Sequence, residues 1–435
     1  MGAIVGSMFT ILFSALAGGI WIGLTLGATG AVLLAIFRNI PLDKLLAQYA
    51  WNILTTQELL ALPMFILMGE ILFQSRLSRS LFQGLAPWAG LLPGRLLHVN
   101  VVGCSIFAAI SGSSAATTQV VGRMALAELL KRGYSKDIAI GSLAGAGTLG
   151  FLIPPSNIMI IYGVLGDVSV IKLFTAGFIP GFLLAGCFMA WVMIHTTLRP
   201  SLVPETERDL RNLTLLDRIR ALKELAPAMF LIASVLGSMY GGLATPSESA
   251  AVGVLGALIV AALQGGLTVK ALRDIAMGSV LTCSMIAMIL LGASILGSAA
   301  AFLGIPRAIA DFVAGMGLSP FMLIVALIIF YLILGCFLDG FSMIVLTLPI
   351  VLPIVKQAGF DPIWFGIFLV LVVEMAQITP PVGFNLFVIQ GLTGDGLGYI
   401  AKVTLPYLII MVLFTLVLTV FPQVVLFLPR VLAGG

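Results

Sequence analysis

Residues 133–167 read GYSKDIAIGSLAGAGTLGFLIPPSNIMIIYGVLGD, and residues 359–395 read GFDPIWFGIFLVLVVEMAQITPPVGFNLFVIQGLTGD. Each stretch begins with a Gly-aromatic pair and later contains a Pro-Pro pair, which starts at Pro154 in the first and at Pro380 in the second. After a two-residue insertion, the Asn and the closing Gly-Asp of the two stretches also match. This agreement predicts an internal repeat, with chance likeness of two helix-turn-helix segments as the alternative.

The composition around these stretches is that of a membrane protein. The chain has 435 residues, of which 60% are hydrophobic and 9% charged. A soluble domain carries about 25% charged residues. Because the apolar runs are continuous and reach the length of about 20 residues that a spanning helix needs, we expect an all-α polytopic fold rather than a barrel. Examples of these runs are 4–36, 174–194, 246–264, 275–305 and 404–428.

A second matched feature lies upstream of each Pro-Pro stretch. It consists of two apolar arms joined by a polar, Gly-containing break, SGSS at residues 111–114 and DGFS at residues 339–342. We interpret both as re-entrant helical hairpins, at about 96–131 and 320–356, whose tips meet near the middle of the membrane. For SGSSAATT the alternative is a small-residue face that packs against another helix.

The charges predict how the two halves lie in the membrane. Residues 195–226 form a charged connector in which Leu or Ile recurs every third position from 210 to 225, which predicts an amphipathic surface helix. Basic residues gather around hairpin 1 far more than around hairpin 2, so hairpin 1 is predicted to enter from the cytoplasm and hairpin 2 from the opposite side. This inverted arrangement predicts about ten full spans plus two hairpins, a cytoplasmic connector and both termini in the periplasm.

The hairpin tips and the Pro-broken helices are the candidate ion-binding elements. A Pro-Pro pair frees backbone carbonyls before it and starts a new helix after it, and broken helices in paired halves point to transporter ion and substrate sites. Simple kinks are the alternative. Small residues allow close backbone approach, while hydroxyl and amide groups supply neutral oxygens. The candidates are Ser111, Gly112, Ser113, Ser114, Pro154, Asn157, Asp339, Gly340, Ser342, Thr379, Pro380 and Asn385.

Three carboxylates occur in apolar sequence, where ionisable residues are costly. Asp339, at a predicted tip, either neutralises a cation or caps the next helix. Glu374 is either a proton- or ion-binding group or an internal hydrogen-bond partner. Glu248 follows Pro246 at the start of a span, which favours a structural role at the helix N-terminus.

No metal-ligand spacing is present. His98 and His195 stand alone, and the four cysteines are far apart in apolar sequence, so we expect no transition metal and read the cysteines as core residues. The sequence contains no phosphate-binding loop of an ATP-driven pump. An intramembrane serine enzyme is a remote alternative, because His98 is the only histidine near the SGSS hydroxyls. A channel is disfavoured by the paired hairpins.

The motifs SGSSAATT, GFLIPPSN, ATPSESAAVG, LTLPIVLPI and ITPPVGFNLFV occur in that order along the chain. With them the sequence resembles the large membrane (M, DctM-like) subunit of tripartite ATP-independent periplasmic (TRAP) transporters. The resemblance implies an elevator-type fold and Na⁺-coupled uptake of an organic acid such as a dicarboxylate or sialic acid, with no organic cofactor. It also implies a bacterial inner-membrane location and two partners, a small four-helix Q-type membrane subunit and a soluble periplasmic P-type binding protein.

The resemblance also assigns roles along the chain. It implies Na⁺ sites at the candidate residues above and a substrate site at Ser114, Ser156, Asn157, Gly383 and Asn385. Because LDGFS is less rich in Ser and Thr than the first tip, backbone carbonyls are expected to dominate there. A stand-alone ion-coupled anion carrier of the same superfamily is the main alternative. The implied divisions are 1–75 (scaffold, repeat 1), 76–194 (transport part, repeat 1), 195–226 (connector), 227–275 (scaffold, repeat 2) and 276–428 (transport part, repeat 2).

Overall fold

The computed structural model describes residues 2–38, 42–75, 77–204, 214–264, 267–381 and 383–432, and these contain helices and no strands. The first half consists of α1 (Gly2–Ala17), α2 (Ile22–Phe37), α3 (Leu42–Leu54), η1 (Gln57–Leu60), α4 (Ala61–Gln74), α5 (Leu77–Ala89), α6 (Leu97–Ser111), α7 (Ser114–Lys131), α8 (Lys136–Leu152), α9 (Asn157–Gly166) and α10 (Val170–Leu198). The second half consists of η2 (Pro200–Leu202), α11 (Leu215–Tyr240), α12 (Pro246–Leu263), α13 (Val269–Phe302), α14 (Ile305–Gly315), α15 (Pro320–Gly335), α16 (Gly340–Gln357), α17 (Pro362–Gln377), α18 (Phe384–Thr393), α19 (Leu397–Val420) and α20 (Gln423–Leu432).

The helices confirm the repeat. Ser114 begins α7 and Gly340 begins α16, at the same offset that separates the two Pro-Pro pairs, and α8 and α17 begin at that offset too. One difference between the halves is that the single 34-residue helix α13 of the second half corresponds to α3, η1 and α4 of the first. A chance likeness of two segments does not account for helix boundaries that match over this length.

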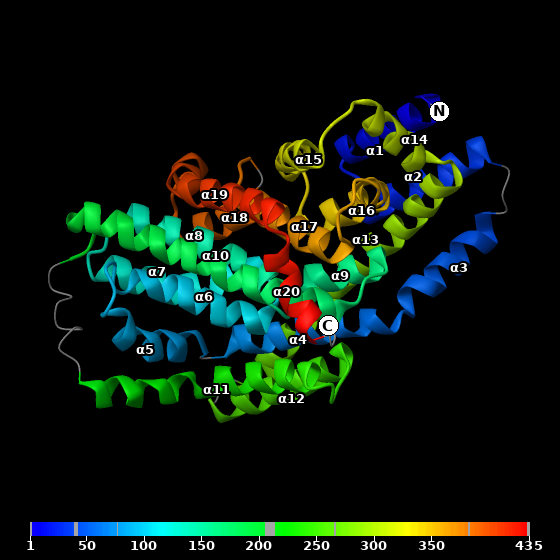
Figure 1. The fold of residues 1–435 in the computed structure, drawn as a ribbon. Helices are drawn as coiled ribbons and strands as arrows, with labels where there is room; N and C mark the ends of the chain where they lie inside the picture. The colour runs from blue at the N-terminus through cyan, green and yellow to red at the C-terminus, as the bar shows by residue number, and fades with distance from the viewer. Residues whose placement is uncertain are drawn as a thin grey trace.

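The halves are interlocked. Helix α2 packs against α13, and its counterpart α12 packs against α4. In the same way α9 packs against α16, while its counterpart α18 packs against α7. These two contacts therefore each have an exchanged copy, as a two-fold relation between inverted repeats requires. In Figure 1, α6, α7, α8 and α10 lie side by side, with α11 and α12 along one edge of the molecule.

Both predicted hairpins are pairs of helices. Helices α6 and α7 are joined at residues 112–113, and α15 and α16 at residues 336–339. Each is followed by a helix that ends just before a Pro-Pro pair and a short helix that begins after it, and both Pro-Pro peptide bonds are cis. The predicted fold class of inverted repeats with hairpins and Pro-broken helices is confirmed.

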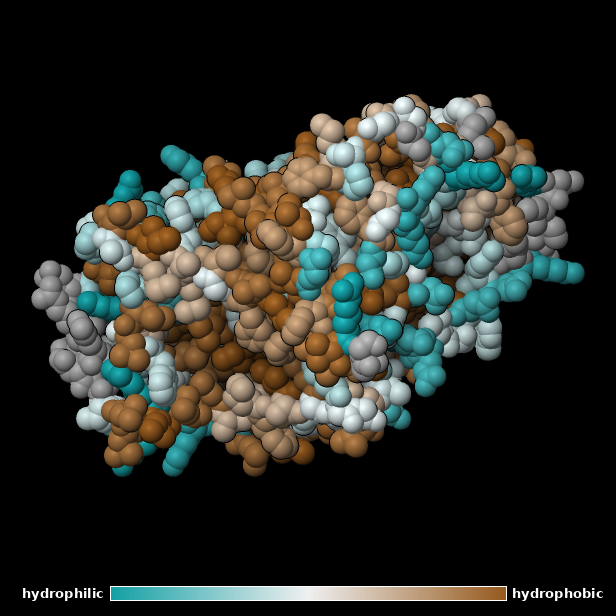
Figure 2. Space-filling model, viewed as in Figure 1, coloured by the Kyte–Doolittle hydropathy of each residue, from teal (hydrophilic) through white to brown (hydrophobic). Residues whose placement is uncertain are grey.

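The surface is apolar where a lipid-facing surface is expected. Seven of the described helical segments are long and apolar enough to cross a membrane, including the broken pair α8–α9 and the hairpin arm α16. Large apolar side chains such as Trp21 and Leu263 are 79% and 84% exposed. Figure 2 shows apolar residues over much of the middle of one face. The prediction of a multi-pass membrane protein is confirmed.

The connector differs from its prediction. Helix α10 continues to Leu198, residues 205–213 lie outside the described residues, and α11 begins only at Leu215. This helix then runs without interruption to Tyr240, because a capping box between Thr214 and Asp217 sets its start and the apolar span follows directly. Part of the expected amphipathic connector over 195–226 lies outside the described residues, and its last part forms the first turns of α11, whose leucines are exposed as in a surface helix.

Candidate functional site

The first hairpin turns sharply at Gly112. This residue ends α6 with φ +59°, a left-handed conformation in which glycine has no steric penalty. Ser113 then caps α7 by accepting a hydrogen bond from the Ala116 amide. The Ser111 hydroxyl lies 3.0 Å from the Thr117 hydroxyl across the tip. The tip is thus a compact turn whose hydroxyls and carbonyls bond to one another.

The first Pro-Pro break closes onto this tip. The backbone amide of Asn157 donates a hydrogen bond to the Gly112 carbonyl at 3.3 Å. A Cβ on Gly112 would lie 2.7 Å from the Pro155 carbonyl oxygen, so only glycine fits against the break. Residues 151–160 are all buried, and Ser156 caps α9 by accepting from the Met159 amide. Tip 1 and break 1 therefore form one closed unit.

The second half also reaches tip 1. The Asn385 side-chain amide, in the first turn of α18, donates to the Ser114 hydroxyl at 2.8 Å. Ser114 in turn donates to the Gly147 carbonyl of α8 at 3.2 Å. Asn385 and Ser114 are both fully buried. One hydrogen-bond chain thus joins the helix after break 2, the first tip and the helix before break 1.

Two buried amide oxygens at this junction have no hydrogen-bond partner among the residues that the structure describes. They are Oδ1 of Asn157 and Oδ1 of Asn385, which occupy repeat-related positions just after the two breaks. Asn157 Oδ1 would lie 3.3 Å from a Cβ on Gly112. Buried polar atoms in native structures normally have partners, so an unpartnered one indicates a missing water, ion or ligand. Asn100, in α6, has a similar oxygen, about 18 Å along the helix from the tip at 1.5 Å per residue.

Sequence reasoning missed the part played by α8. A Cβ on Gly150 would lie 2.5 Å from the Ser113 carbonyl oxygen, and one on Gly147 would lie 1.9 Å from the Thr118 hydroxyl. These two glycines let α8 approach the tip, and Gly150 allows the Ser113 carbonyl to lie directly against α8. The signal was the run GAGTLG, whose glycines recur at helical spacing.

The second tip uses its carboxylate as a helix cap. Asp339 accepts hydrogen bonds from the amides of Phe341 and Ser342 at 3.0 and 3.3 Å, and the Ser342 hydroxyl donates to its other oxygen. Of the two roles expected for Asp339, the structure shows the capping role. Gly340 packs tightly against α17, because a Cβ there would lie 2.4 Å from Val373.

The second Pro-Pro break is exposed at the surface of the protein, whereas the first is buried. Pro380 and Pro381 are exposed, in contrast to the buried first pair. The Pro380 carbonyl accepts from the Cys336 thiol at 3.3 Å, and the Thr379 hydroxyl donates back into its own helix. Gly383 is buried against the Thr379 carbonyl, 2.8 Å from where a Cβ would lie. Of the candidates in the second half, only Asn385 bonds to tip 1.

A cleft of about 1170 Å³ adjoins the second tip. It lies between α1, α2 and α13 on one side and the end of α15 with Asp339 on the other. Its lining is almost entirely apolar and includes Phe13, Trp21, Met285 and Phe337. The cleft separates the second tip from the α2–α13 pair.

Helix ends give the junction its electrostatic character. Helices α6 and α8 end at Ser111 and Leu152, and helix C-termini favour cations. Helices α7, α9 and α18 begin at the same place, and helix N-termini favour anions such as carboxylates. Within the described residues no group of three His, Cys, Asp or Glu side chains could hold a metal ion. The arrangement suits a weakly held monovalent cation beside an organic anion.

Comparison with known proteins places these motifs in a family context. Residues 9–424 match the sequence family described as "Tripartite ATP-independent periplasmic transporter, DctM component". The chain is 34% identical over 410 residues to the C4-dicarboxylate TRAP transporter large permease protein DctM of Pseudomonas aeruginosa, covering 93% of this chain and 94% of the relative. It is 32% identical over 407 residues to the isethionate TRAP transporter permease protein DctMQ of Oleidesulfovibrio alaskensis, covering 93% of this chain and 63% of that protein.

A solved structure shares the fold. The crystal structure of the Alcanivorax borkumensis YdaH transporter, which has an unusual topology, superposes with a TM-score of 0.65 at 14% sequence identity. The match covers 92% of this chain and 96% of that one. At this identity the likeness concerns the fold alone.

Proposed function

Because the chain belongs to the DctM-component family of tripartite ATP-independent periplasmic transporters, we propose that it is the translocating subunit of a Na⁺-coupled uptake system for an organic acid. In this proposal the transport region moves by an elevator mechanism. The family consists of transporter permeases, so the prediction of a transporter rather than an enzyme is confirmed.

The observation that carries the Na⁺ proposal is the pair of unpartnered amide oxygens at Asn157 and Asn385. Leaving a polar group buried without a partner costs about 1–3 kcal/mol. Two such oxygens in repeat-related positions, beside a tip and the C-terminal ends of two helices, match the way broken helices coordinate Na⁺ in transporters. A dehydrated Na⁺ coordinated by both oxygens would offset the free-energy cost of burying each of them without a partner.

The proposed Na⁺ ligands follow from this geometry. At tip 1 they are the two amide oxygens with the carbonyls and hydroxyls of residues 111–114 and the break at Pro154. At tip 2 we propose backbone carbonyls of Gly340, Thr379 and Pro380, with Ser342. Asp339 contributes there through its charge while it caps α16.

Two features support the elevator proposal. The hairpins and broken helices pack closely among themselves through the α7–α18 and α9–α16 contacts. The pairs α2–α13 and α4–α12 form a second set of close contacts. We assign this set to the scaffold, which moves the scaffold boundary of the second half from residue 275 to the end of α13. The apolar cleft separates tip 2 from α2 and part of α13, whereas α13 packs directly against α16, so we propose that sliding occurs along the α13–α16 contact.

We propose a small organic anion as the substrate, since the relatives' names refer to a dicarboxylate and to isethionate. The helix starts at Ser114, Ser156–Asn157 and Gly383–Asn385 would bind its acidic group through backbone amides. The partners would be a small Q-type membrane subunit and a periplasmic binding protein. The name of the Oleidesulfovibrio alaskensis relative joins the letters M and Q in one protein. The location would be the inner membrane, with both termini in the periplasm.

Uptake in proteoliposomes tests the proposal. The chain is reconstituted with its small subunit, and labelled C4-dicarboxylate or isethionate uptake is measured under an inward Na⁺ gradient, with and without the binding protein. We expect uptake only with Na⁺ and the binding protein. Uptake by the chain alone would instead establish the stand-alone carrier.

Matched variants locate the ion site. Asn385→Ala removes one unpartnered oxygen and the bond to Ser114, whereas Asn100→Ala removes a buried amide that bonds to Ser142 and the Ala139 carbonyl. We expect Asn385→Ala to lower the apparent Na⁺ affinity at least about tenfold, equivalent to about 1.4 kcal/mol, and Asn100→Ala to leave it unchanged. Equal Na⁺ dependence in both variants would contradict the assignment.

A further inference from the structure

Glu374 is a buried carboxyl that the proposed Na⁺ site does not use. It lies in α17, one turn before the end of the helix, and is 0% exposed. Among the described residues, neither carboxyl oxygen has a well-aligned hydrogen-bond partner. The backbone amides of Leu152 and Phe151, at the end of α8, are the donors that interact with the carboxyl. The role of an internal hydrogen-bond partner, one of the two expected from the sequence, therefore rests on these two backbone amides and on no side chain that the structure describes.

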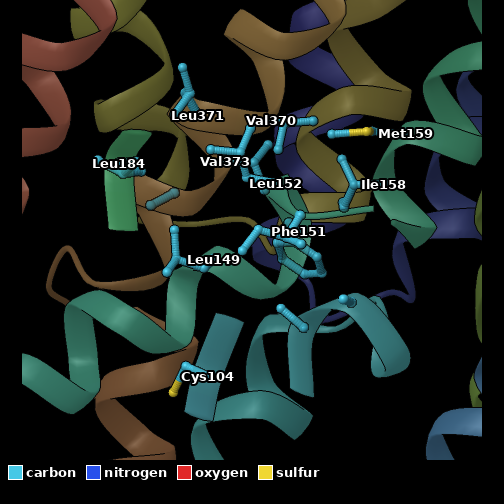
Figure 3. Close-up of a cluster of buried hydrophobic side chains, with 14 of the residues drawn as sticks. Cys104, Leu149, Phe151, Leu152, Ile158, Met159, Leu184, Val370, Leu371 and Val373 are labelled. Carbon is cyan, nitrogen blue, oxygen red and sulfur yellow. The ribbon is translucent and has the colours of Figure 1, made fainter. Parts of the chain in front are cut away.

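The surroundings of Glu374 are apolar. Figure 3 shows Val370 and Val373 of α17 beside Leu152 and Ile158, which lie on either side of the first Pro-Pro break. All four are buried members of the same hydrophobic cluster. An isolated ionised carboxylate in such surroundings is so costly that the group takes up a proton instead.

No described charge balances this carboxyl. Among the described residues no basic side chain forms an ion pair with Glu374, and no charged group lies close enough to act on it. Most titratable groups on the helices packed against α17 bond elsewhere or sit near helix ends, whereas the buried Tyr407 hydroxyl has no partner in the part of the chain that the structure describes. Those with bonds elsewhere are Tyr162 to the Pro362 carbonyl, Tyr331 to Thr347, Asp339 to the α16 amides, and Lys136 to Asp395. Tyr407 packs against Phe188 and the α8 glycines, and Lys172, Lys356, Lys402 and Arg430 lie near helix ends.

The repeat shows that the fold does not need a carboxyl here. The repeat-related position in the first half is Thr148, which is also fully buried and donates to the Gly145 carbonyl within its own helix at 2.7 Å. A neutral side chain satisfied within its helix fills the corresponding place in α8. The acid at 374 is thus a specific addition to the second half.

We propose that Glu374 is a proton-binding site in the transport region, and that uptake requires this proton to be in place. The carboxylate takes a proton from water to become a neutral acid and returns it on ionisation, so no other reactant is involved. Ionisation would place an unbalanced charge between α17 and the end of α8, next to the first break. The proton therefore keeps the two broken helices packed together.

Infrared spectroscopy of the purified full-length chain tests proton binding without Na⁺ or partners. At about pH 7, the carbonyl-stretch band of a protonated carboxylic acid should be present in the wild type and reduced in Glu374→Gln. Glu128→Gln, which removes a surface carboxylate paired with Arg132, is the matched control and should leave the band unchanged. Identical wild-type and Glu374→Gln spectra in this region would mean that Glu374 is ionised and would overturn the proposal.

The uptake requirement rests on the proposed transport function and is tested separately. Wild-type uptake should fall by up to about tenfold per pH unit once Glu374 ionises, because the protonated fraction falls at that rate. Glu374→Gln mimics the neutral acid, so its uptake should lack this decline at a constant Na⁺ gradient. The same alkaline decline in both proteins would overturn the requirement. Absence of Na⁺-driven uptake in the wild type would instead contradict the proposed function and leave the infrared result to decide proton binding.

Discussion

Replacing Gly112 with alanine tests how tightly tip 1 closes on the first break. Gly112 has φ +59°, and an added Cβ would lie 2.7 Å from the Pro155 carbonyl oxygen, a backbone atom that cannot rotate away. Either the tip or the break must shift. The shift would lengthen the bond from the Asn157 amide to the Gly112 carbonyl, already 3.3 Å, and would move Asn157 Oδ1.

The cost has three parts. A left-handed alanine costs about 1–2 kcal/mol, overpacking costs about 1–3 kcal/mol, and a lost hydrogen bond costs about 0.5–1.5 kcal/mol. Gly394 isolates the first part, because it has φ +75° and nothing within 4 Å of an added Cβ. Gly112→Ala should therefore destabilise the protein by about 2–4 kcal/mol more than Gly394→Ala.

The assay is thermal unfolding in detergent, followed for both variants with Na⁺ and with K⁺ at equal ionic strength. We expect a lower midpoint for Gly112→Ala than for Gly394→Ala, and loss of the Na⁺-specific rise in the midpoint only in Gly112→Ala. Equal midpoints and equal Na⁺ responses in the two variants would refute the account of tip 1 as a closed ion-binding turn.

Two further predictions concern other contacts. Gly292→Ala in α13 would place a Cβ 2.0 Å from the Gly23 carbonyl oxygen of α2, so it should lower the stability of the protein by about 3 kcal/mol. Gly237→Ala in α11, where no atom lies within 4 Å of an added Cβ, should be neutral or stabilising by up to about 1 kcal/mol in the same unfolding assay. The hydrogen bond from Lys136 holds the pKa of the Asp395 carboxyl, in the loop before α19, below its ordinary value. The stabilisation of the folded protein by the ionised Asp395 is present above the unfolded-state pKa of about 3.9, and it is lost as pH falls through the lower folded-state pKa. The midpoint difference between wild type and Asp395→Asn should therefore begin to shrink as pH falls below about 4, and a difference that stays constant down to the acid limit of the assay would contradict the pairing.

Much of the architecture could be predicted because its signals are local. Gly112 and the two Pro-Pro pairs dictate turns and helix ends wherever they occur, and the return of the Pro-Pro pair at Pro380 revealed the repeat. The capping role of Asp339 was also available, since Asp followed three residues later by Ser suits a helix start. The break between α3 and α4 was not predicted. There the hydroxyls of Thr55 and Thr56 donate to backbone carbonyls one turn back, which competes with helix continuation.

The pairings across the molecule could not be predicted. The bond between Asn385 and Ser114 joins residues 271 positions apart, and no local pattern selects that partner. The same holds for the closed state of the first break and the open state of the second, since both contain the same Pro-Pro pair. Which oxygens remain unpartnered depends on these tertiary contacts. The candidate residues were therefore accessible from the sequence, while their convergence on tip 1 was not.

The most direct test of the central claim is equilibrium binding of radiolabelled Na⁺ to the purified full-length chain. We predict saturable binding that excess unlabelled Na⁺ displaces and K⁺ does not. Asn157→Ala and Asn385→Ala should each reduce this binding, and Asn100→Ala should preserve it. Saturable binding that all three variants retain at wild-type affinity, or the absence of saturable binding in the wild type, would contradict the assignment of the Na⁺ site to tip 1 and the two broken helices.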